Sequence, residues 1–389
     1  MSNFNKYTYL RMYHMASGLV LSLFFVFGPR KKKRVIFNST HNRSYNFNSK
    51  YLFEYFLKQP EWECKFVVDD DIKREKLIAE VGPYFISSRG LRNKIYCLLA
   101  GVWVTSSMET PVGGIFLSVR RLVYHLGHGV PIKSIGLAEK SITWYKRLYY
   151  RLVRTNFTCF LATSEFMIEP IRRFVGVSAN KVVVHSQPRL EPLIPYVSSQ
   201  TPKRPFKILY APTWRHYREV ELFPFSDFKH ETLAADLERL DCELHLRLHP
   251  YYENSKYVES FKGGRVKSLT SKLVPEIMDV LHEYDMVITD YSSIYVDYLL
   301  LDRPITFFAY DLAEYKEKVG FLVDFENLSP GPKAQSYSEF IQYLEQVRAG
   351  NDAFATERKR VNALLNGKVV HPCEENYSFV INQAEVNLH

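Results

Sequence analysis

Short apolar runs alternate with segments of helical spacing along most of the chain. Strand-like runs lie at 35–39, 64–70, 84–88, 102–107, 122–127, 158–164 and 181–186, and helical spacing lies between several of them, at 49–57, 72–81 and 91–100. Continuous apolar runs of this length are typical of strands that are buried on both faces. Their alternation with helices therefore predicts a parallel sheet that begins near residue 35.

A second series of the same kind follows residues 192–205, where Pro, Ser and Lys are frequent and a linker is predicted. Its strand-like runs are 207–215, 243–250, 265–270, 286–293 and 304–311, and helical spacing covers 231–240, 274–284 and 338–347. Two successive series predict an α/β protein with two doubly wound, Rossmann-like domains facing a cleft. Ligands of such domains bind beyond the carboxyl ends of the strands.

The N-terminal region has a different pattern. Residues 16–28 are mostly apolar, and the basic run PRKKKR follows at 29–34. A spanning helix needs about 20 apolar residues, so this run favours an in-plane anchor on an anionic membrane surface, with residues 1–34 as the membrane-associating segment. An ordinary buried helix is the alternative. The stretch 142–154, where Lys and Arg alternate with Trp, Tyr and Leu, has the same two interpretations.

Composition narrows the class of protein without choosing a ligand. The chain has 389 residues, 46% of them hydrophobic, which is enough for two domain cores. A net charge of +9 suits nucleic acid, an anionic membrane or a phosphorylated substrate. The five cysteines are scattered and form no CxxC pair, so neither a disulfide framework nor a zinc site is expected, and a reducing compartment fits.

The first candidate site lies in TDYSS, where a predicted strand passes into a helix. This motif contains Asp290, Ser292 and Ser293. Amide groups at a helix N-terminus bind anions and serine hydroxyls add donors, so a phosphate or diphosphate site is one interpretation. Plain capping by Ser292, with Asp290 as a turn residue, is the other.

The loop HLGHGVPIK places further polar residues after a predicted strand. It contains His125, His128 and Lys133, and its glycines Gly127 and Gly129 allow the backbone to approach a ligand closely. A histidine in such a loop can act as a general base near neutral pH.

Two strand ends of the second series carry basic side chains. LRLHP places Arg247 and His249 at one of them, and APTWR places Arg215 at the other, followed by His216 and Arg218. A lone histidine is more often structural, but several His and Arg residues at successive strand ends favour one basic pocket suited to a diphosphate. No HExxH motif or carboxylate cluster accompanies them, so no metal site is expected.

Six motifs occur in the order GHGVPIK, SQPRLEPL, ILYAPTWR, LRLHP, VITDYSSIYVDYLLLDRPITFFAYD and DFENLSPGP. Together, over roughly residues 35–370, the chain resembles the CDP-glycerol glycerophosphotransferase family, the teichoic acid primases and polymerases. The resemblance implies the two-domain GT-B fold. It implies an acceptor-side domain at 35–195, a CDP-donor-binding domain at 205–375 and a C-terminal helix at 376–389 that packs back on the first domain.

The resemblance also implies a reaction, in which a hydroxyl of a membrane-linked glycan attacks the β-phosphorus of CDP-glycerol and CMP leaves. His128 matches the family's expected base, and His249 matches the histidine of its RxHP motif, a diphosphate contact or an acid. Ser292 and Ser293 match serines that cradle phosphate. The remaining donor-site and supporting candidates are Arg215, Arg247, Asp290, Asp297, Gly129 and Lys133.

The implied partners are a lipid-linked glycan acceptor and an anionic membrane surface, without nucleic acid, and the implied location is peripheral, on the cytoplasmic face of the bacterial membrane. The donor is CDP-glycerol or a related CDP-polyol, and a requirement for a divalent cation is left open. Two departures bear on the donor: Gly127 stands where the family usually has Trp, and Val319 where it usually has Arg. Loss of an arginine removes a forked phosphate donor, for which Lys316 or Lys318 are the candidate substitutes.

Two other function classes remain open. A GT-B glycosyltransferase using a nucleotide sugar would share the cleft, but such enzymes more often carry an acidic donor-sugar motif in the second domain. A non-enzymatic binder of anionic glycan or nucleic acid is less favoured, because the sequence contains no recognisable nucleic-acid-binding motif.

Overall fold

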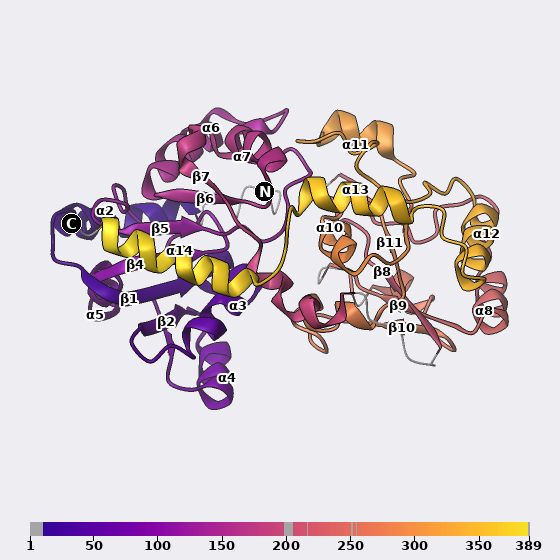
Figure 1. The fold of residues 1–389 in the computed structure, drawn as a ribbon, viewed down its shortest axis with the longest axis horizontal. Coiled ribbons are helices and arrows are strands. Elements are labelled where there is room, and N and C mark those ends of the chain that lie inside the picture. The colour runs from indigo at the N-terminus through magenta and orange to yellow at the C-terminus, as the bar shows by residue number, and fades with distance from the viewer. Residues whose placement is uncertain (1–10, 198–204, 216, 250–251, 254, 388–389) are drawn as a thin grey trace. The chain divides into compact units, whose positions relative to one another are not determined.

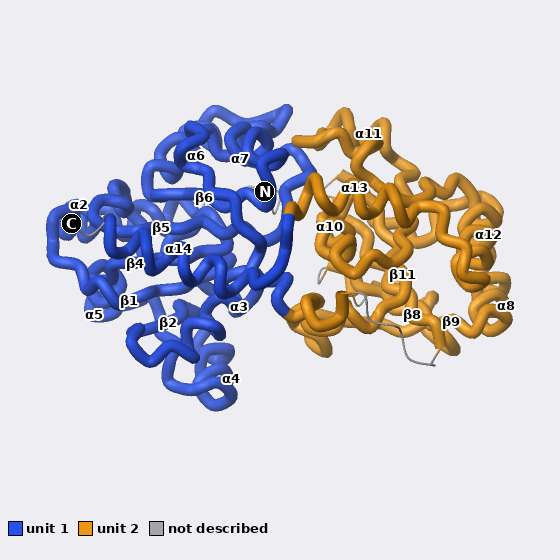
Figure 2. Tube along the Cα trace, in the orientation of Figure 1, with its two compact units in different colours: residues 1–191, 368–389 blue, residues 192–367 orange. Residues whose placement is uncertain are grey.

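The computed structural model describes residues 11–197, 205–215, 217–249, 252–253 and 255–387. His216 and Pro250, which belong to the predicted strand-end motifs, lie outside these ranges. The chain divides into two compact units (Figure 2). Unit 1 comprises residues 1–191 and 368–389, and unit 2 comprises residues 192–367.

Unit 1 is built on a seven-stranded sheet with the order β3-β2-β1-β4-β5-β6-β7, and all of its strand pairs are parallel. The strands are β1 Lys31–Asn38, β2 Glu63–Val67, β3 Phe85–Ile86, β4 Ala100–Thr105, β5 Leu122–His125, β6 Cys159–Ala162 and β7 Val182–Val184. Every residue of β4, β5 and β6 is buried. These continuous apolar runs therefore form the centre of the sheet, covered on both faces, as the sequence predicts.

Helices flank this sheet (Figure 1). They are α2 Leu19–Phe24, α3 Phe47–Phe56, α4 Asp71–Val81, α5 Leu91–Leu98, α6 Trp144–Val153, α7 Ile168–Val175 and α14 Pro372–Asn387. Short 3₁₀ segments lie at Thr40–Asn42, Gly136–Ala138, Arg154–Asn156, Glu165–Met167, Ala179–Lys181 and, between the two units in sequence, Pro188–Tyr196. α14 packs against α3 and across β1, β4 and β5, so the end of the chain completes unit 1.

Unit 2 contains a five-stranded parallel sheet with the order β10-β9-β8-β11-β12. Its strands are β8 Phe206–Tyr210, β9 Cys242–Leu246, β10 Val266–Ser268, β11 Met286–Thr289 and β12 Ile305–Phe307. Its helices are α8 His230–Arg239, α9 Lys256–Glu259, α10 Ile294–Tyr298, α11 Leu312–Lys318, α12 Tyr337–Arg348 and α13 Ala355–Leu365. A 3₁₀ turn at Leu299–Leu301 extends α10.

The predicted helix at 274–284 is wrong. The structure has two 3₁₀ turns there, Ile277–Asp279 and Leu281–Glu283. Pro275 disfavours helical geometry at the residue before it, and Val280 interrupts the turns with φ −125° and ψ −1°. The apolar spacing in this segment serves burial of Met278 and Leu281 without a continuous helix.

The predicted N-terminal segment also differs from the structure. Its basic end, Lys31–Arg34, forms the first half of β1, so the boundary at residue 34 falls inside a strand. Arg34 is buried and pairs with Glu63 at 2.7 Å. The apolar run divides between helical residues 11–17 and α2. The two helical segments meet at Gly18, where a side chain would collide with the Gly113 carbonyl oxygen. Among the described residues, no helix is long and apolar enough to cross a membrane.

The C-terminal helix begins earlier than predicted. Unit 2 ends at Gly367 and α14 starts at Pro372, before the expected boundaries at 375 and 376. Asn376, fully buried in α14, donates to the Ser186 carbonyl and accepts from the Tyr124 hydroxyl, both at 2.8 Å. Because these partners belong to unit 1, the helix is an integral part of it.

Candidate functional site

His128 lies in the loop after β5, at the carboxyl end of the sheet in unit 1. Its Nδ1 atom is 3.2 Å from the Ser106 carbonyl oxygen. A carbonyl oxygen can only accept, so this contact favours the tautomer with hydrogen on Nδ1 and a lone pair on Nε2. Loss of solvent around the ring, together with the positive charges of Arg189 and Lys133, lowers the pKa of His128. The ring is therefore neutral at pH 7, as a general base must be.

A buried asparagine holds this loop in place. Asn48 is fully buried, and its Nδ2 atom donates to the carbonyl oxygens of Leu126 at 3.1 Å and Gly127 at 2.9 Å. Its Oδ1 atom accepts from the backbone N–H of Arg189 at 3.0 Å. The Arg189 guanidinium then donates to the His128 carbonyl oxygen. Sequence reasoning missed Asn48 and Arg189, although Arg189 lies in the motif SQPRLEPL.

The two glycines beside His128 have left-handed backbone conformations. Gly127 has φ +70° and Gly129 has φ +140°. At Gly127 a Cβ atom would meet nothing closer than 3.9 Å, so the constraint is conformational rather than steric. His125, in contrast, is 5% exposed among Phe157, Phe160 and Phe174, and burial lowers its pKa to about 3. His125 is a core residue.

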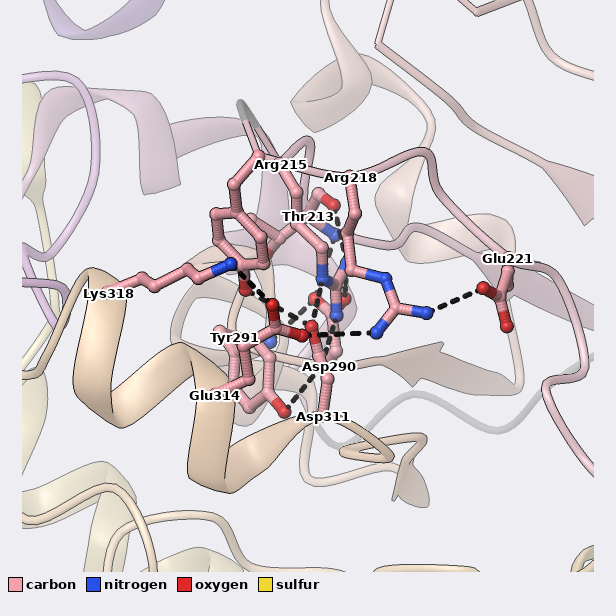
Figure 3. A network of polar contacts seen from close by, with 10 residues as sticks. Thr213, Arg215, Arg218, Glu221, Asp290, Tyr291, Asp311, Glu314 and Lys318 are labelled. Atoms are coloured by element: carbon pink, nitrogen blue, oxygen red, sulfur yellow. Dashed lines mark hydrogen bonds and ion pairs between the residues drawn. The ribbon is translucent and has the colours of Figure 1, made fainter.

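In unit 2, the predicted phosphate ligands Arg215 and Asp290 form a closed network (Figure 3). The Arg215 side chain is 0% exposed and forms two hydrogen bonds to Asp311, at 2.6 and 2.8 Å. It also pairs with Asp290 at 2.8 Å and donates to the Thr213 carbonyl oxygen at 2.8 Å. The Tyr291 hydroxyl donates to Asp311 at 2.9 Å.

This network engages the side chains of Arg215 and Asp290 with protein groups, and their contact with the donor stays a prediction. Burial alone would lower the pKa of Arg215, but the charge of Asp290 and the hydrogen bond to Asp311 raise it. Asp290 Oδ1 accepts from the backbone N–H of Thr213 at 2.7 Å. The three ionised groups therefore fasten together the loops after β8, β11 and β12, and their side chains face protein rather than open space.

Arg247 and Asp297, whose role at the donor site also stays a prediction, are enclosed by protein as well. Arg247 donates to the carbonyl oxygens of Leu269 at 3.1 Å and Val274 at 2.8 Å, and burial lowers its pKa. Asp297 is fully buried in α10. Both residues lie in the expected motifs, and Arg247 connects the strand end to the backbone of Leu269 and Val274.

The accessible polar groups at this edge of unit 2 are Ser292, Ser293 and His249. Both serines are partly exposed, and Ser293 directly precedes α10 without forming a side-chain capping hydrogen bond. His249 is exposed after β9, and its ring stacks on Trp214 with centroids 5.5 Å apart. His249 follows β9, Trp214 follows β8, and the two serines follow β11. These three strands lie side by side in the sheet, in the order β9-β8-β11.

The lysines considered as substitutes for the arginine absent at Val319 are both engaged. Lys316 pairs with Glu326, and Lys318 pairs with Glu314 at 2.6 Å. Within the described residues, no group of three or more His, Cys, Asp or Glu side chains is placed to hold a metal ion.

Comparison with known proteins identifies relatives across most of the chain. The family model described as CDP-Glycerol:Poly(glycerophosphate) glycerophosphotransferase matches residues 20–368. A teichoic acid poly(glycerol phosphate) polymerase of Bacillus subtilis (strain 168) is 26% identical over 371 residues, covering 87% of this chain and 46% of that protein. A teichoic acid glycerol-phosphate transferase of Staphylococcus aureus is 22% identical, covering 81% of this chain and 84% of that protein.

The solved structures confirm the predicted fold class. The wall teichoic acid polymerase TagF, in a histidine-to-asparagine form soaked with CDPG, gives a TM-score of 0.76 at 19% identity, covering 98% of this chain and 99% of that one. A UDP-GlcNAc 2-epimerase from Neisseria meningitidis bound to UDP-GlcNAc gives 0.53 at 10% identity, covering 90% and 99%. Two parallel α/β units with this likeness constitute a GT-B fold.

Proposed function

Because the chain belongs to the CDP-glycerol:poly(glycerophosphate) glycerophosphotransferase family, we propose that it transfers a polyol phosphate to a hydroxyl of a lipid-linked glycan and releases CMP. CDP-glycerol is the first donor to test, and the pathway is teichoic acid or capsule synthesis. The observation that carries the proposal is the position of His128 in the loop after β5, where the Ser106 carbonyl oxygen favours the tautomer with a lone pair on Nε2. The chain spans 46% of one polymerase relative, so its own activity needs direct measurement.

His128 is the general base in this proposal. Its Nε2 atom takes the proton of the acceptor hydroxyl while the hydroxyl oxygen bonds to the β-phosphorus of the donor. The bond between that phosphorus and the bridging oxygen breaks, and CMP leaves with the electron pair. General-base catalysis of this kind contributes about 10² to 10⁴ in rate. Asn48 and Arg189 act as positioning residues, because they fix the loop that carries the base.

Unit 2 supplies the donor contacts. We assign Ser292 and Ser293 as hydroxyl donors to the diphosphate, and His249 as a diphosphate contact or as the acid for the leaving CMP. The network of Arg215, Asp290 and Asp311 keeps the loop of the two serines in place. Because Gly127 and Val319 depart from the residues usual in the family, CDP-ribitol and other CDP-polyols stay candidate donors.

An exposed apolar surface on unit 1 supports peripheral attachment to an anionic membrane on its cytoplasmic face. Val20, Phe24 and Phe27 are 80%, 81% and 79% exposed, and Trp144 on α6 is 77% exposed. The helix α2 and the end of α6 both bond to the loop at 114–115. Ser22 Oγ of α2 accepts from the Ile115 N–H at 3.2 Å, and Asn156, just after α6, donates to the Gly114 carbonyl oxygen at 2.9 Å. Apolar and aromatic side chains beside basic ones are typical of an interfacial surface.

The experiment is release of labelled CMP from CDP-glycerol by the full chain with a lipid-linked glycan acceptor, alongside CDP-ribitol and UDP-GlcNAc. Formation of CMP together with a new phosphodiester on the acceptor is the expected result. Release of UDP from the nucleotide sugar instead would make the protein a glycosyltransferase. Binding of the acceptor without release of any nucleotide would make it a binding protein.

A further inference from the structure

A cavity in unit 1 is not used by the reaction described above. Its volume is about 490 Å³, within the range of small-molecule sites. It is lined by residues that follow β1, β2, β3 and β4, among them Asn42, Asp69, Ser88 and Glu109, and by the helical residues 11–17. Its walls therefore come from the same sheet edge that carries His128.

Glu109 lines this cavity, and one of its carboxylate oxygens is buried without a hydrogen-bond partner among the described residues. The residue is 4% exposed, and its Oε1 atom contacts Arg11 and, at 3.3 Å, His41. Oε2 has no hydrogen-bond partner among the described residues. Burial alone would raise the pKa of Glu109, but the positive charge of Arg11 and the contact with His41 lower it. The Ser107 hydroxyl lowers this pKa to a smaller extent, although it forms no hydrogen bond to Oε2. A buried, ionised oxygen without a donor calls for a ligand hydroxyl.

Cations form another part of the cavity wall. Arg43 is exposed, and no hydrogen bond or ion pair of its side chain to another described residue occurs in the structure. Arg89 has only a long contact, 3.4 Å from Asp71, and Lys94 has one of 3.4 Å to the Ser17 carbonyl oxygen. Gly90, between them, starts α5 without a side-chain cap. Three cations beside an open helix start suit a phosphate group.

The one other acid on the wall is already satisfied. Asp69 accepts from the Ser88 backbone N–H and hydroxyl, both at 2.7 Å, and from the Ser87 hydroxyl at 2.9 Å. Its oxygens are therefore occupied by protein donors, and no ion pair joins Asp69 to Arg43, Arg89 or Lys94 among the described residues. One part of the cavity thus suits a phosphate and another suits a hydroxyl.

We propose that this cavity binds a phosphate-bearing, hydroxyl-rich segment of the acceptor. Arg43, Arg89 and Lys94 hold the phosphate, and a polyol or sugar hydroxyl donates to Glu109 Oε2. The proposal rests on the proposed function and adds a subsite to it. Glu109 lies in the same loop after β4 as Ser106, which holds His128, and residues 11–17 lead directly into the exposed apolar α2. An acceptor bound here connects a lipid surface with the base.

The test measures binding of glycerol phosphate and of inorganic phosphate to the full chain by calorimetry, without turnover. Arg43→Gln combined with Arg89→Gln should weaken binding of both probes by about tenfold or more, because charge-assisted hydrogen bonds are lost. Arg92→Gln is the matched control, since Arg92 is exposed on α5 outside the cavity lining and should bind as wild type. Glu109→Gln should weaken binding of glycerol phosphate more than that of inorganic phosphate.

CDP-glycerol binding separates this subsite from the donor site. Under the proposal, its Kd stays within about twofold of wild type in the double variant. Equal weakening of CDP-glycerol and glycerol phosphate would place the donor in the cavity and overturn the assignment. Unchanged binding of glycerol phosphate in the double variant would also overturn it. Failure of the wild-type chain to release CMP would instead refute the proposed function, while the binding results would still decide on the cavity.

Discussion

The carboxyl edges of the two sheets are both rich in charged residues, but they use them differently. In unit 2, Arg215 is completely enclosed by Asp290 and Asp311, so its donors are occupied by protein. In unit 1, His128 is fixed through Nδ1 alone, and Glu109 keeps one oxygen without a partner. Polar strand-end motifs therefore form a closed network in one unit and leave polar groups without partners among the described residues in the other. The two edges therefore differ in whether the polar side chains are bonded to other protein groups.

Removing the reactive side chain should have the largest effect on activity. We expect His128→Asn to lower turnover by about 10² to 10⁴, because the amide can still donate to the Ser106 carbonyl oxygen but cannot accept a proton. Steady-state CMP release checks the rate, and calorimetry checks that the Kd for CDP-glycerol is unchanged. Turnover within a few fold of wild type would remove His128 from the role of base.

Breaking the scaffold should reduce stability. Arg215→Met leaves Asp290 and Asp311 buried without their counter-ion, and loss of one partner of a buried pair costs about 3–5 kcal/mol. Denaturant unfolding measures this change. Arg218→Met is the matched control, because Arg218 pairs with Glu221 and Glu314 at the exposed rim of the same network, so its loss should be much smaller (Figure 3). Equal losses would contradict the assignment of Arg215 as the core of the scaffold.

The serines of unit 2 should affect donor binding rather than stability. Ser292→Ala with Ser293→Ala removes two hydroxyl donors, and we expect the Kd for CDP-glycerol to rise by about tenfold, as hydrogen bonds to a charged group are lost. Ser336→Ala provides the contrast, because Ser336 caps α12 by accepting from the Glu339 N–H at 3.1 Å. That variant should lose stability and retain donor affinity. The reverse pattern would make the serines of TDYSS ordinary caps.

The smallest expected effect concerns pH. The lowered pKa of His128 means that the base form persists below pH 6.5, so the acid limb of kcat/KM should have its midpoint below that value. Lys133→Met removes a positive charge that lowers this pKa, and the midpoint should therefore move upward. Lys73→Met, exposed on α4, should leave it in place. A midpoint that does not respond to Lys133 would assign the acid limb to another group.

The sequence predicts the sheets better than the sites. β4 and β11 are recognisable because their buried residues are consecutive, and the alternation of strands with helices identifies two α/β units. The sequence does not reveal that the basic run at 31–34 belongs to a strand, because exposed lysines on a strand and on a membrane flank have the same pattern. Local spacing has no means of distinguishing them.

The contacts of the site residues depend on parts of the chain that are distant in sequence. Whether Arg215 binds a ligand or a protein carboxylate depends on Asp311, which lies 96 residues away. Asn48 contacts Leu126 across 78 residues, so its role is invisible until β1, β4 and β5 have assembled. The sequence does predict that His128 and the serines of TDYSS follow strands, the edge of a parallel sheet at which ligands bind, and their roles stay predictions.

The return of α14 to unit 1 has a consequence for biosynthesis. Unit 2 is continuous in sequence, whereas unit 1 needs residues 368–389 as well as 1–191. A ribosome therefore completes unit 2 before it synthesises the helix whose Asn376 bonds to Tyr124 and Ser186. During translation the nascent chain holds β1, β4 and β5 with one covering helix missing. Unit 1, which carries His128, is thus completed only after all of unit 2 has been synthesised.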